Sequence, residues 1–405
     1  MSKGIGFEPA GAETEAARAD ILESTRTTKM ARSAHAFVRG NTVQFYEWLE
    51  GLDRGTLPEG PAVWICGDCH VGNLGPLASA EGRVDIQIRD LDQTVIGNPA
   101  HDIIRLGVSL ASAARGSDLP GVTTALMLEE MMRGYALGLA DPGDDGAVPE
   151  PDVVSFVRRE ALGRSWRHLA RERLENVKPT IPLGKKFWAL SPDERAAIKD
   201  LFQQPAVKTM VLSLNGRPED SKLELLDAAY WMKGCSSLGK LRYAALVKIN
   251  GNRKGKLALV DLKEAVPAAA PAAPGVVMPT HFGERVVAGA KALSPNLGER
   301  MMAADFLDRP VVLRELMPED LKLEIEQFSR EQAVKAARYL AFVVGSAHGR
   351  QMDDATRATW RRDLAHRRPG NLDAPSWLWS SVIELLIRHE QGYLEHCRRY
   401  ALRAA

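Results

Sequence analysis

Residues 66–73 read Cys-Gly-Asp-Cys-His-Val-Gly-Asn, and the acidic stretch Asp90-Leu91-Asp92 follows after a short insert and a strand-like run at 84–88. Asp68 and Asn73 therefore lie five residues apart in a loop that contains glycine. One carboxylate can orient and deprotonate a hydroxyl group, while an amide oxygen and a second carboxylate can hold Mg²⁺ on the phosphates of a nucleotide. This combination predicts phosphoryl transfer.

The composition is that of an ordinary globular protein. The chain has 405 residues, which is enough for two domains or lobes. Its formal net charge is +1, so there is no global field that would attract nucleic acid or an anionic membrane. Residues 1–10 lack the apolar core of a secretory signal, and no apolar run is long enough to span a bilayer. We therefore expect a cytoplasmic protein with no nucleic-acid or membrane partner and with reduced cysteines.

After residue 220 the sequence changes from helical patterns to short apolar runs. The runs lie at 228–232, 241–249 and 257–262. Asn250-Gly251-Asn252 separates the second run from the third, and Asn-Gly between two strands is a strong hairpin signal. The pattern predicts an antiparallel meander, followed by an Ala- and Pro-rich loop at 267–274, a helix at 283–293 and a further strand at 309–316.

Two features of this middle region suit a polyphosphate group. The turn between the first two strands carries the glycines and serines Gly234, Ser236, Ser237 and Gly239. Glycines let backbone amides approach phosphates, and Lys263 on the third strand can reach them. Either feature alone is explained as well by a plain hairpin turn and a solvent-facing lysine. We expect Lys263 to pair with a glutamate of the next helix, first Glu284 and second Glu299.

The regions on both sides of the meander are predicted to be helical. The expected helices cover 13–50, 99–114, 122–139, 152–175, 330–349, 355–366 and 376–403. Near the start of the second of these, Asp102 is placed to accept backbone amides of the Asp68 loop, and Arg105 one turn later can pair with an acid.

The Cys-x-x-Cys-His pattern of Cys66, Cys69 and His70 also matches the attachment site of c-type haem. Haem attachment needs an oxidising compartment and an export signal, which the sequence does not show. A zinc site built on the same three residues would lack a fourth ligand. We therefore interpret the pattern as a coincidence.

The loop and the acidic motif resemble those of the protein-kinase-like superfamily, in particular its aminoglycoside-phosphotransferase branch. There, a His-Gly-Asp-x-His-x-x-Asn loop is followed by a strand and an Asp-x-Asp motif, and here Cys66 replaces the first histidine. The resemblance implies ATP and Mg²⁺ as cofactors and Asp68 as the catalytic base. It also implies Asn73 and Asp90 as magnesium ligands, with Asp92 as an auxiliary ligand.

The whole chain is also similar to a bacterial family of uncharacterised proteins of comparable length. The shared features are Phe37-Val38-Arg39-Gly40, the loop at 67–73, Lys263-Glu264-Ala265, Arg285-Val286-Val287 and Ala347-His348-Gly349-Arg350. This resemblance carries no assigned substrate.

The order of the motifs differs from that of ordinary kinases, in which the glycine turn and the lysine precede the catalytic loop. A circular permutation accounts for the difference. We therefore expect an α+β, two-lobed, protein-kinase-like fold. The small antiparallel lobe would comprise residues 220–316, and the large, mainly helical lobe would comprise 1–219 and 317–405. Adenine would lie against the strand at 311–316.

The predicted function is ATP- and Mg²⁺-dependent transfer of a phosphoryl group to a hydroxyl on an unidentified small molecule or protein. His70 and Arg105 are candidates for contacting that acceptor. Two alternatives stay open. One is a nucleotide-binding pseudokinase without catalysis. The other is a metal-dependent phosphoester hydrolase, whose candidate residues are Asp68, His70, Asp90, Asp92 and His101.

Overall fold

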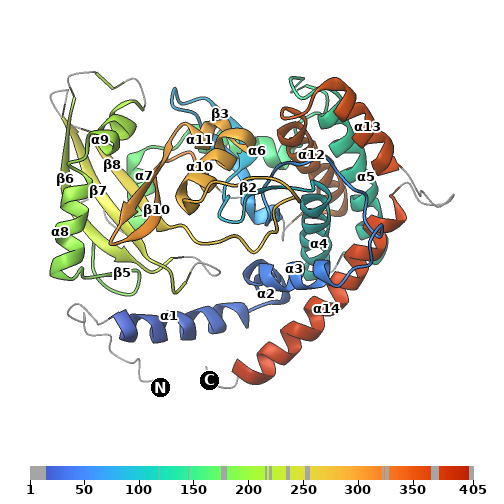
Figure 1. Cartoon of the computed structure of the whole chain (residues 1–405), viewed down its shortest axis with the longest axis horizontal. Coiled ribbons are helices and arrows are strands. Elements are labelled where there is room, and N and C mark those ends of the chain that lie inside the picture. The colour runs from blue at the N-terminus through green and yellow to red at the C-terminus, as the bar shows by residue number, and fades with distance from the viewer. Residues whose placement is uncertain are drawn as a thin grey trace.

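A computed structural model describes residues 15–400, except for 118, 145, 175–179, 215–216, 219–220, 234–237, 251–255, 322, 324–327 and 366–373. The fold is α+β, as predicted: helices surround one larger and two small antiparallel sheets (Figure 1). Within the described residues, none of the helices combines the length and the apolar character needed to cross a lipid bilayer.

The larger sheet has six strands in the order β5-β6-β7-β8-β10-β9. The strands are β5 (Phe187–Trp188), β6 (Lys222–Trp231), β7 (Arg242–Asn250), β8 (Lys256–Glu264), β9 (Met301–Phe306) and β10 (Arg309–Leu316). Between β8 and β9 the chain forms α10 (Phe282–Leu293) and the short α11 (Pro295–Gly298). The expected meander and the strand at 309–316 are thus confirmed.

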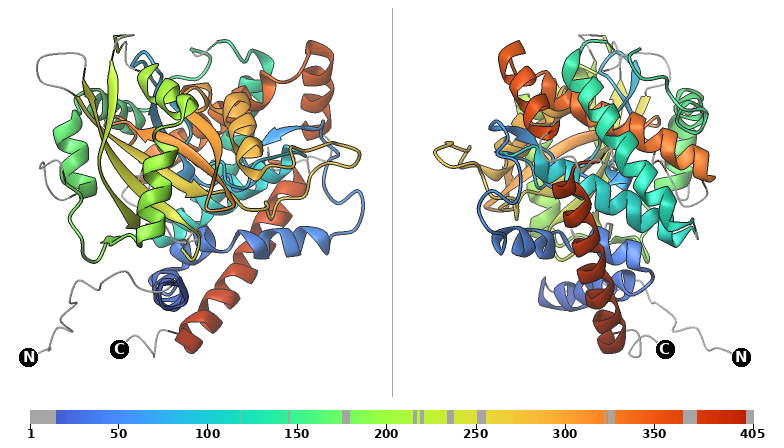
Figure 2. Two further views of the ribbon diagram at one scale, coloured as in Figure 1. Left: turned by 60° about the vertical axis from the view of Figure 1, so that its left-hand side comes forward. Right: turned by 90° about the vertical axis from the view of Figure 1, so that its right-hand side faces the viewer.

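Alternation along the strands gives this sheet two apolar faces. On one face Tyr243, Val260 and Leu313 belong to a cluster with residues of α8 (Pro192–Leu201) and α9 (Pro205–Leu212). On the other face, called here the inner face, Leu246 and Leu259 pack with Leu169 and Leu174 of α7 (Trp166–Leu174). The sheet is therefore covered by helices on both sides (Figure 2).

The helical part contains α4 (Ala100–Gly116), α5 (Gly121–Ala140), α6 (Asp152–Leu162), α12 (Arg330–Gly349), α13 (Asp354–Ala365) and α14 (Ser376–Tyr400). The predicted helix at 152–175 is divided into α6 and α7, with Gly163 as the C-cap of α6. Glycines bring α5 and α12 together: a Cβ on Gly134 would overlap the carbonyl of Arg338, and one on Gly345 would overlap that of Tyr135.

Two small sheets lie between the larger sheet and the helices. One pairs β1 (Val63–Ile65) with β4 (Val95–Gly97), and the other pairs β2 (Leu74–Ala78) with β3 (Val84–Ile88). The loop that carries Asp68 connects β1 to β2, and the 90–92 motif connects β3 to β4. The two loops are therefore held at the same place in the fold.

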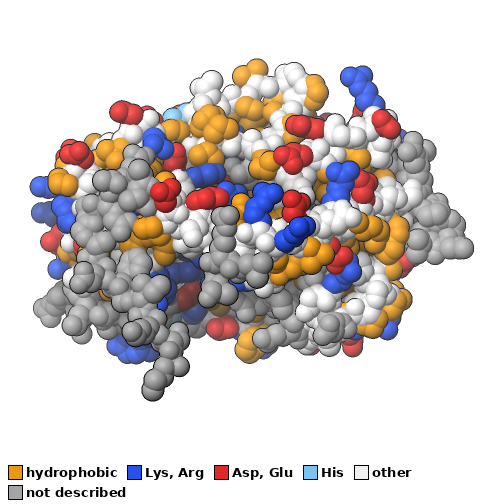
Figure 3. Space-filling view, turned by 90° about the horizontal axis from the view of Figure 1, so that it is seen from below, with side chains coloured by type: hydrophobic (Ala, Val, Ile, Leu, Met, Phe, Trp, Pro, Cys, Tyr) orange, Lys and Arg blue, Asp and Glu red, His pale blue; other side chains and the backbone are white. Residues whose placement is uncertain are grey.

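The N-terminal helices α1 (Glu15–Met30), α2 (Ala34–Gly40) and α3 (Thr42–Glu50) run along the lower side of the molecule in Figure 1. At one end of α1, Arg18 forms a buried ion pair with Glu194 of α8. At the other end, His396 of α14 donates to the carbonyl of Thr27 at 2.8 Å. Helix α1 thus connects the sheet to the helical part. On the face seen from below, basic and acidic side chains are interspersed (Figure 3).

Candidate active site

The loop that follows β1 is fixed through its backbone by Asp102 of α4. The carboxylate of Asp102 accepts hydrogen bonds from the amides of Cys66 at 2.7 Å and Gly67 at 2.9 Å, which confirms the expected bracing role. Gly67 has a φ of 74°, and a Cβ there would overlap the carbonyl of Gln93. Only glycine fits this conformation without strain.

A buried chain of hydrogen bonds supports Asp102. His348, at the end of α12, lies with its Nε2 3.1 Å from Oδ2 of Asp102. A carboxylate only accepts, so this nitrogen carries the hydrogen. Nδ1 lies within hydrogen-bonding distance of the hydroxyl of Tyr135, at 2.9 Å, and that hydroxyl accepts from the indole of Trp360 at 3.3 Å. Helices α4, α5, α12 and α13 therefore all contribute to the position of one loop.

The side chain of Asp68 is held on both of its oxygens. Arg105, itself fully buried, donates from Nε to Oδ1 at 2.8 Å, so its expected acid partner is Asp68. Thr42 donates its hydroxyl to Oδ2 at 2.9 Å. Nε2 of His70 lies 3.9 Å from the same oxygen. The amide nitrogen of Asn73 donates to the backbone carbonyl of Asp68 at 3.0 Å. The amide oxygen of Asn73 is therefore available as a ligand for a cation.

Lys263 of β8 meets the acidic motif that follows β3. Its ammonium lies 3.6 Å from Oδ1 of Asp90 and forms a closer ion pair with Oδ2 of Asp92. Partial desolvation raises the pKa of Asp90, but Lys263, Arg314 and Arg242 outweigh it and lower this pKa below its ordinary value. Desolvation and the neighbouring Asp90 raise the pKa of Asp92. The side chain of Asp90 is 46% exposed and therefore accessible to a ligand.

Asp68, Asn73 and the two acids of the 90–92 motif share one small polar cleft. Its lining residues are Thr42, Asp68, Asn73, Asp90, Asp92, Gln93 and Lys240. The structure thus brings together the predicted Asp68, Asn73, Asp90 and Asp92, with Lys263 paired to the two acids. Gly239, with a φ of 95°, lies directly before Lys240. The predicted Gly234, Ser236 and Ser237 lie outside the described residues.

The expected pairing of Lys263 with a glutamate is wrong. Glu284 and Glu299 are both exposed, and the ion pairs of Lys263 within the described residues are those with Asp90 and Asp92. Glu284 lies on the solvent side of α10, whereas the neighbouring Arg285 is buried.

Arg285 attaches α10 to the acidic motif, a role that the sequence analysis did not assign. Its guanidinium donates to the carbonyls of Asp92 and Val266, each at 2.8 Å, and to that of Thr94. One side chain thus connects α10, the 90–92 motif and the segment after β8. The sequence did contain a signal for this role: an arginine among apolar residues, as in Phe-Gly-Glu-Arg-Val-Val, indicates a buried side chain.

Among the described residues, no group of three or more His, Cys, Asp and Glu side chains is arranged to hold a metal ion, either at Cys66, Cys69 and His70 or at the 90–92 motif. Cys66 and Cys69 are fully buried. A hydrogen bond with Cys69 and burial raise the pKa of the Cys66 thiol well above its ordinary value. Burial lowers the pKa of His101 to about 4.

Comparison with known proteins gives one family match. Residues 18–399 match the family described as "Uncharacterized protein conserved in bacteria (DUF2252)". No curated protein and no solved structure matches the chain significantly.

Proposed function

The chain belongs to the DUF2252 family of bacterial proteins, and from that premise we propose that it is a Mg²⁺- and ATP-dependent phosphotransferase with Asp68 as its catalytic base. The observation that carries the proposal is the meeting of Lys263 with Asp90 and Asp92 beside Asp68. Asp90 and Asp92 line both the cleft that contains Asp68 and the pocket that contains Lys263. An amine from the sheet and acids from loops far away in the sequence thus lie close together, as transfer of a phosphoryl group requires.

The arrangement of the elements supports a kinase-like fold with permuted chain order. Strands β6 to β10 with the intervening α10 follow the pattern expected for the small lobe, with Lys263 on the third strand. The last turn of helix α12 places His348 beside the Asp68 loop, although the two are far apart in the sequence. This is the neighbourhood that a circular permutation predicts.

In the proposed reaction, an acceptor hydroxyl lies against Asp68 and transfers its proton to this carboxylate as its oxygen bonds to the terminal phosphorus of ATP. The bond from that phosphorus to the bridging oxygen breaks, and ADP leaves. Arg105 and Thr42 hold the carboxylate in one orientation, which favours an aligned attack. The oxygens of Asn73 and Asp90 would hold Mg²⁺, which neutralises phosphate charge when bound. Lys263 adds a further positive charge for the phosphates. The acceptor is a small molecule or a protein.

Asp68→Asn tests the role of the base. We expect the variant to bind ATP with Mg²⁺ in a thermal-shift assay and to lose about a hundred- to ten-thousand-fold of ATP turnover, the usual contribution of a positioned base. Asp53→Asn, at an exposed loop position, is the matched control and should behave as the wild type. Undiminished turnover in Asp68→Asn would show that Asp68 is not the base.

A non-catalytic nucleotide-binding protein is the second candidate, and one observation favours it. Asp68 is already paired with Arg105, and Lys263 with Asp92, so the cleft keeps its charges balanced without a ligand. Binding of ATP by the wild type with no turnover to water or to any acceptor would support this candidate over the enzyme.

A further inference from the structure

The cleft beside Asp68 contains a cation to which the proposed reaction gives no role. Of the described residues that line this cleft, Lys240 alone is positively charged. Lys263 lies in the adjoining pocket, where its ammonium is already paired with Asp90 and Asp92. The positive charge of the cleft itself therefore comes from Lys240.

The backbone around Lys240 is held by its neighbours. The hydroxyl of Tyr230, on β6, donates to the carbonyl of Lys240 at 3.1 Å. The amide of Leu241 donates to the carboxylate of Glu264 at 2.8 Å, and the carbonyl of Leu241 accepts from the amide of Glu264 at 2.8 Å. Glu264 is in turn paired with Arg309 at 3.2 Å. Lys240 therefore extends from a fixed point directly before β7.

The side chain of Lys240, by contrast, is not paired. Its ammonium forms no ion pair with any residue that the structure describes, and the residue is only partly exposed. Burial lowers the pKa of Lys240, whereas the charge of Asp92 raises it, so the ammonium faces the acidic motif. A surface lysine normally keeps its ammonium in water. A fixed and unpaired ammonium inside a cleft is instead suited to an anionic group of a ligand.

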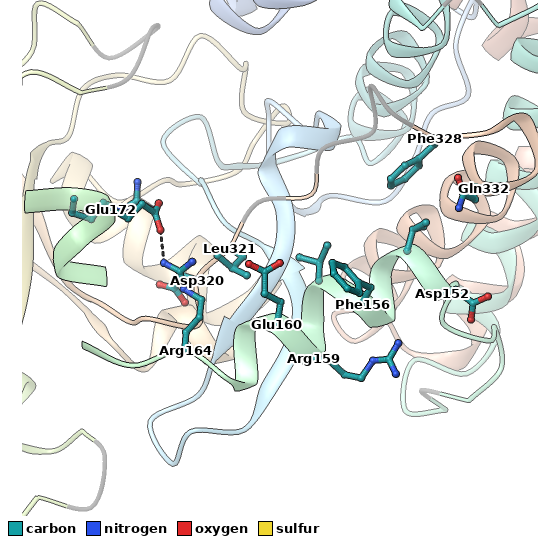
Figure 4. Close-up of a pocket in the computed structure, with 13 residues that line it drawn as sticks. Asp152, Phe156, Arg159, Glu160, Arg164, Glu172, Asp320, Leu321, Phe328 and Gln332 are labelled. Atoms are coloured by element: carbon teal, nitrogen blue, oxygen red, sulfur yellow. Dashed lines mark hydrogen bonds and ion pairs between the residues drawn. The ribbon is translucent and has the colours of Figure 1, made fainter. Parts of the chain in front are cut away.

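The large cavity of about 1020 Å³ between α6, α7 and the segment after β10 supplies no further cation to this cleft (Figure 4). None of the described residues on its wall also lines the cleft beside Asp68. Its Arg164 and Arg173 are both paired with Glu172, and Figure 4 shows the pair formed by Arg164. The charge that meets a group beside Asp68 is therefore that of Lys240.

During phosphoryl transfer, negative charge is spread over the outer oxygens of the group that moves between the two bridging oxygens. A positive charge that contacts these oxygens most closely at that moment lowers the barrier. On the basis of the proposed function, we propose that Lys240 is a catalytic residue whose ammonium binds the outer oxygens of the phosphoryl group during transfer. Lys240 stays protonated throughout, because the proton of the acceptor hydroxyl goes to Asp68.

Turnover of ATP by the full chain with Mg²⁺ tests this role. We expect Lys240→Met to lower kcat about a hundredfold or more, and to change KM for ATP by less than about threefold, because the contact forms in the transition state. Lys240→Arg keeps the charge and should recover at least about tenfold of the lost rate. Lys256→Met, at an exposed position of β8, is the matched control and should behave as the wild type.

A binding measurement separates a catalytic role from a structural one. Aluminium fluoride, added with ADP and Mg²⁺, imitates the phosphoryl group during transfer. We expect it to tighten ADP binding to the wild type at least about a hundredfold in calorimetry, as a transition-state analogue does, and to give no such gain in Lys240→Met. ADP with Mg²⁺ alone should bind equally to both proteins, which also shows that the variant is folded.

The outcomes separate this proposal from the proposed function. If the wild type turns over ATP and Lys240→Met has the same kcat, Lys240 is not catalytic, and the phosphotransferase proposal stands. If Lys240→Met loses turnover while aluminium fluoride still tightens its binding of ADP, the role of Lys240 is structural and this proposal is wrong. If the wild type does not turn over ATP, the phosphotransferase proposal fails and this one fails with it.

Discussion

The carboxylate of Asp102 should account for a large part of the stability of the Asp68 loop. It receives the amides of Cys66 and Gly67 and the imidazole of His348, and all of these groups are buried. Asp102→Ala leaves three buried donors without their acceptor. Each such donor costs about 1 to 3 kcal/mol, so we expect the free energy of unfolding to fall by about 3 to 9 kcal/mol. This loss is comparable to the whole stability of a typical domain, about 5 to 15 kcal/mol.

Urea unfolding followed by tryptophan fluorescence measures the loss. Asp102→Asn keeps the shape of the side chain but removes its charge, so that one acceptor oxygen remains and an NH₂ group faces a donor. We expect a smaller loss of the free energy of unfolding, about 1 to 3 kcal/mol. Asp53→Ala, at an exposed position, is the matched control and should change stability by less than about 0.5 kcal/mol. If Asp102→Ala unfolds within about 1 kcal/mol of the wild type, the loop is not held through this carboxylate.

Three further predictions concern other buried groups. Gly67→Ala should lower the free energy of unfolding in urea titrations by at least about 2 kcal/mol, because φ is 74° and the new Cβ would overlap a carbonyl. Gly82 is the control: its φ is 87° but the space around it is open, so Gly82→Ala should lower the free energy of unfolding by about 1 kcal/mol. Burial and Arg105 lower the pKa of His389 to about 3. Below pH 6.5 the unfolded chain therefore binds a proton that the folded protein does not bind. The free energy of unfolding should fall by about 1.4 kcal/mol per pH unit between pH 6.5 and 3. His389→Leu should remove this contribution to the pH dependence of stability, measured between about pH 7 and 5. Arg18→Met should lower the free energy of unfolding by about 3 to 5 kcal/mol, because it leaves the buried carboxylate of Glu194 without its ion-pair partner. Adding Glu194→Gln should recover most of this loss. If it recovers none, the pair does not hold α1.

Elements with strong local signals were predictable from the sequence. The helix at 330–349 and the strand at 309–316 have the predicted bounds. Strand β9 was missed because the turn after it carries no glycine: Leu307 and Asp308 take φ values of 50° and 58°. Strand β2 was missed because Pro76 argues against a strand, and the structure tolerates it in a two-stranded hairpin.

At the candidate site, the acids were predictable because their residue types and spacing lie within one short segment. The partner of Lys263 was not, because it depends on how α10 docks. Val286, Ala290 and Leu293 define the buried stripe of α10, and Glu284 lies outside it. Helical periodicity therefore contained a signal against this glutamate.

The close contact of α5 with α12 has a mechanical consequence. At Gly134 and Gly345 the backbones of the two helices are packed directly on each other with no side chain between them, which opposes sliding of one helix along the other. Packed interiors of this kind are nearly incompressible and transmit strain. We therefore expect the pair to behave as one stiff unit, so that an opening of the cleft would move the sheet relative to the two helices.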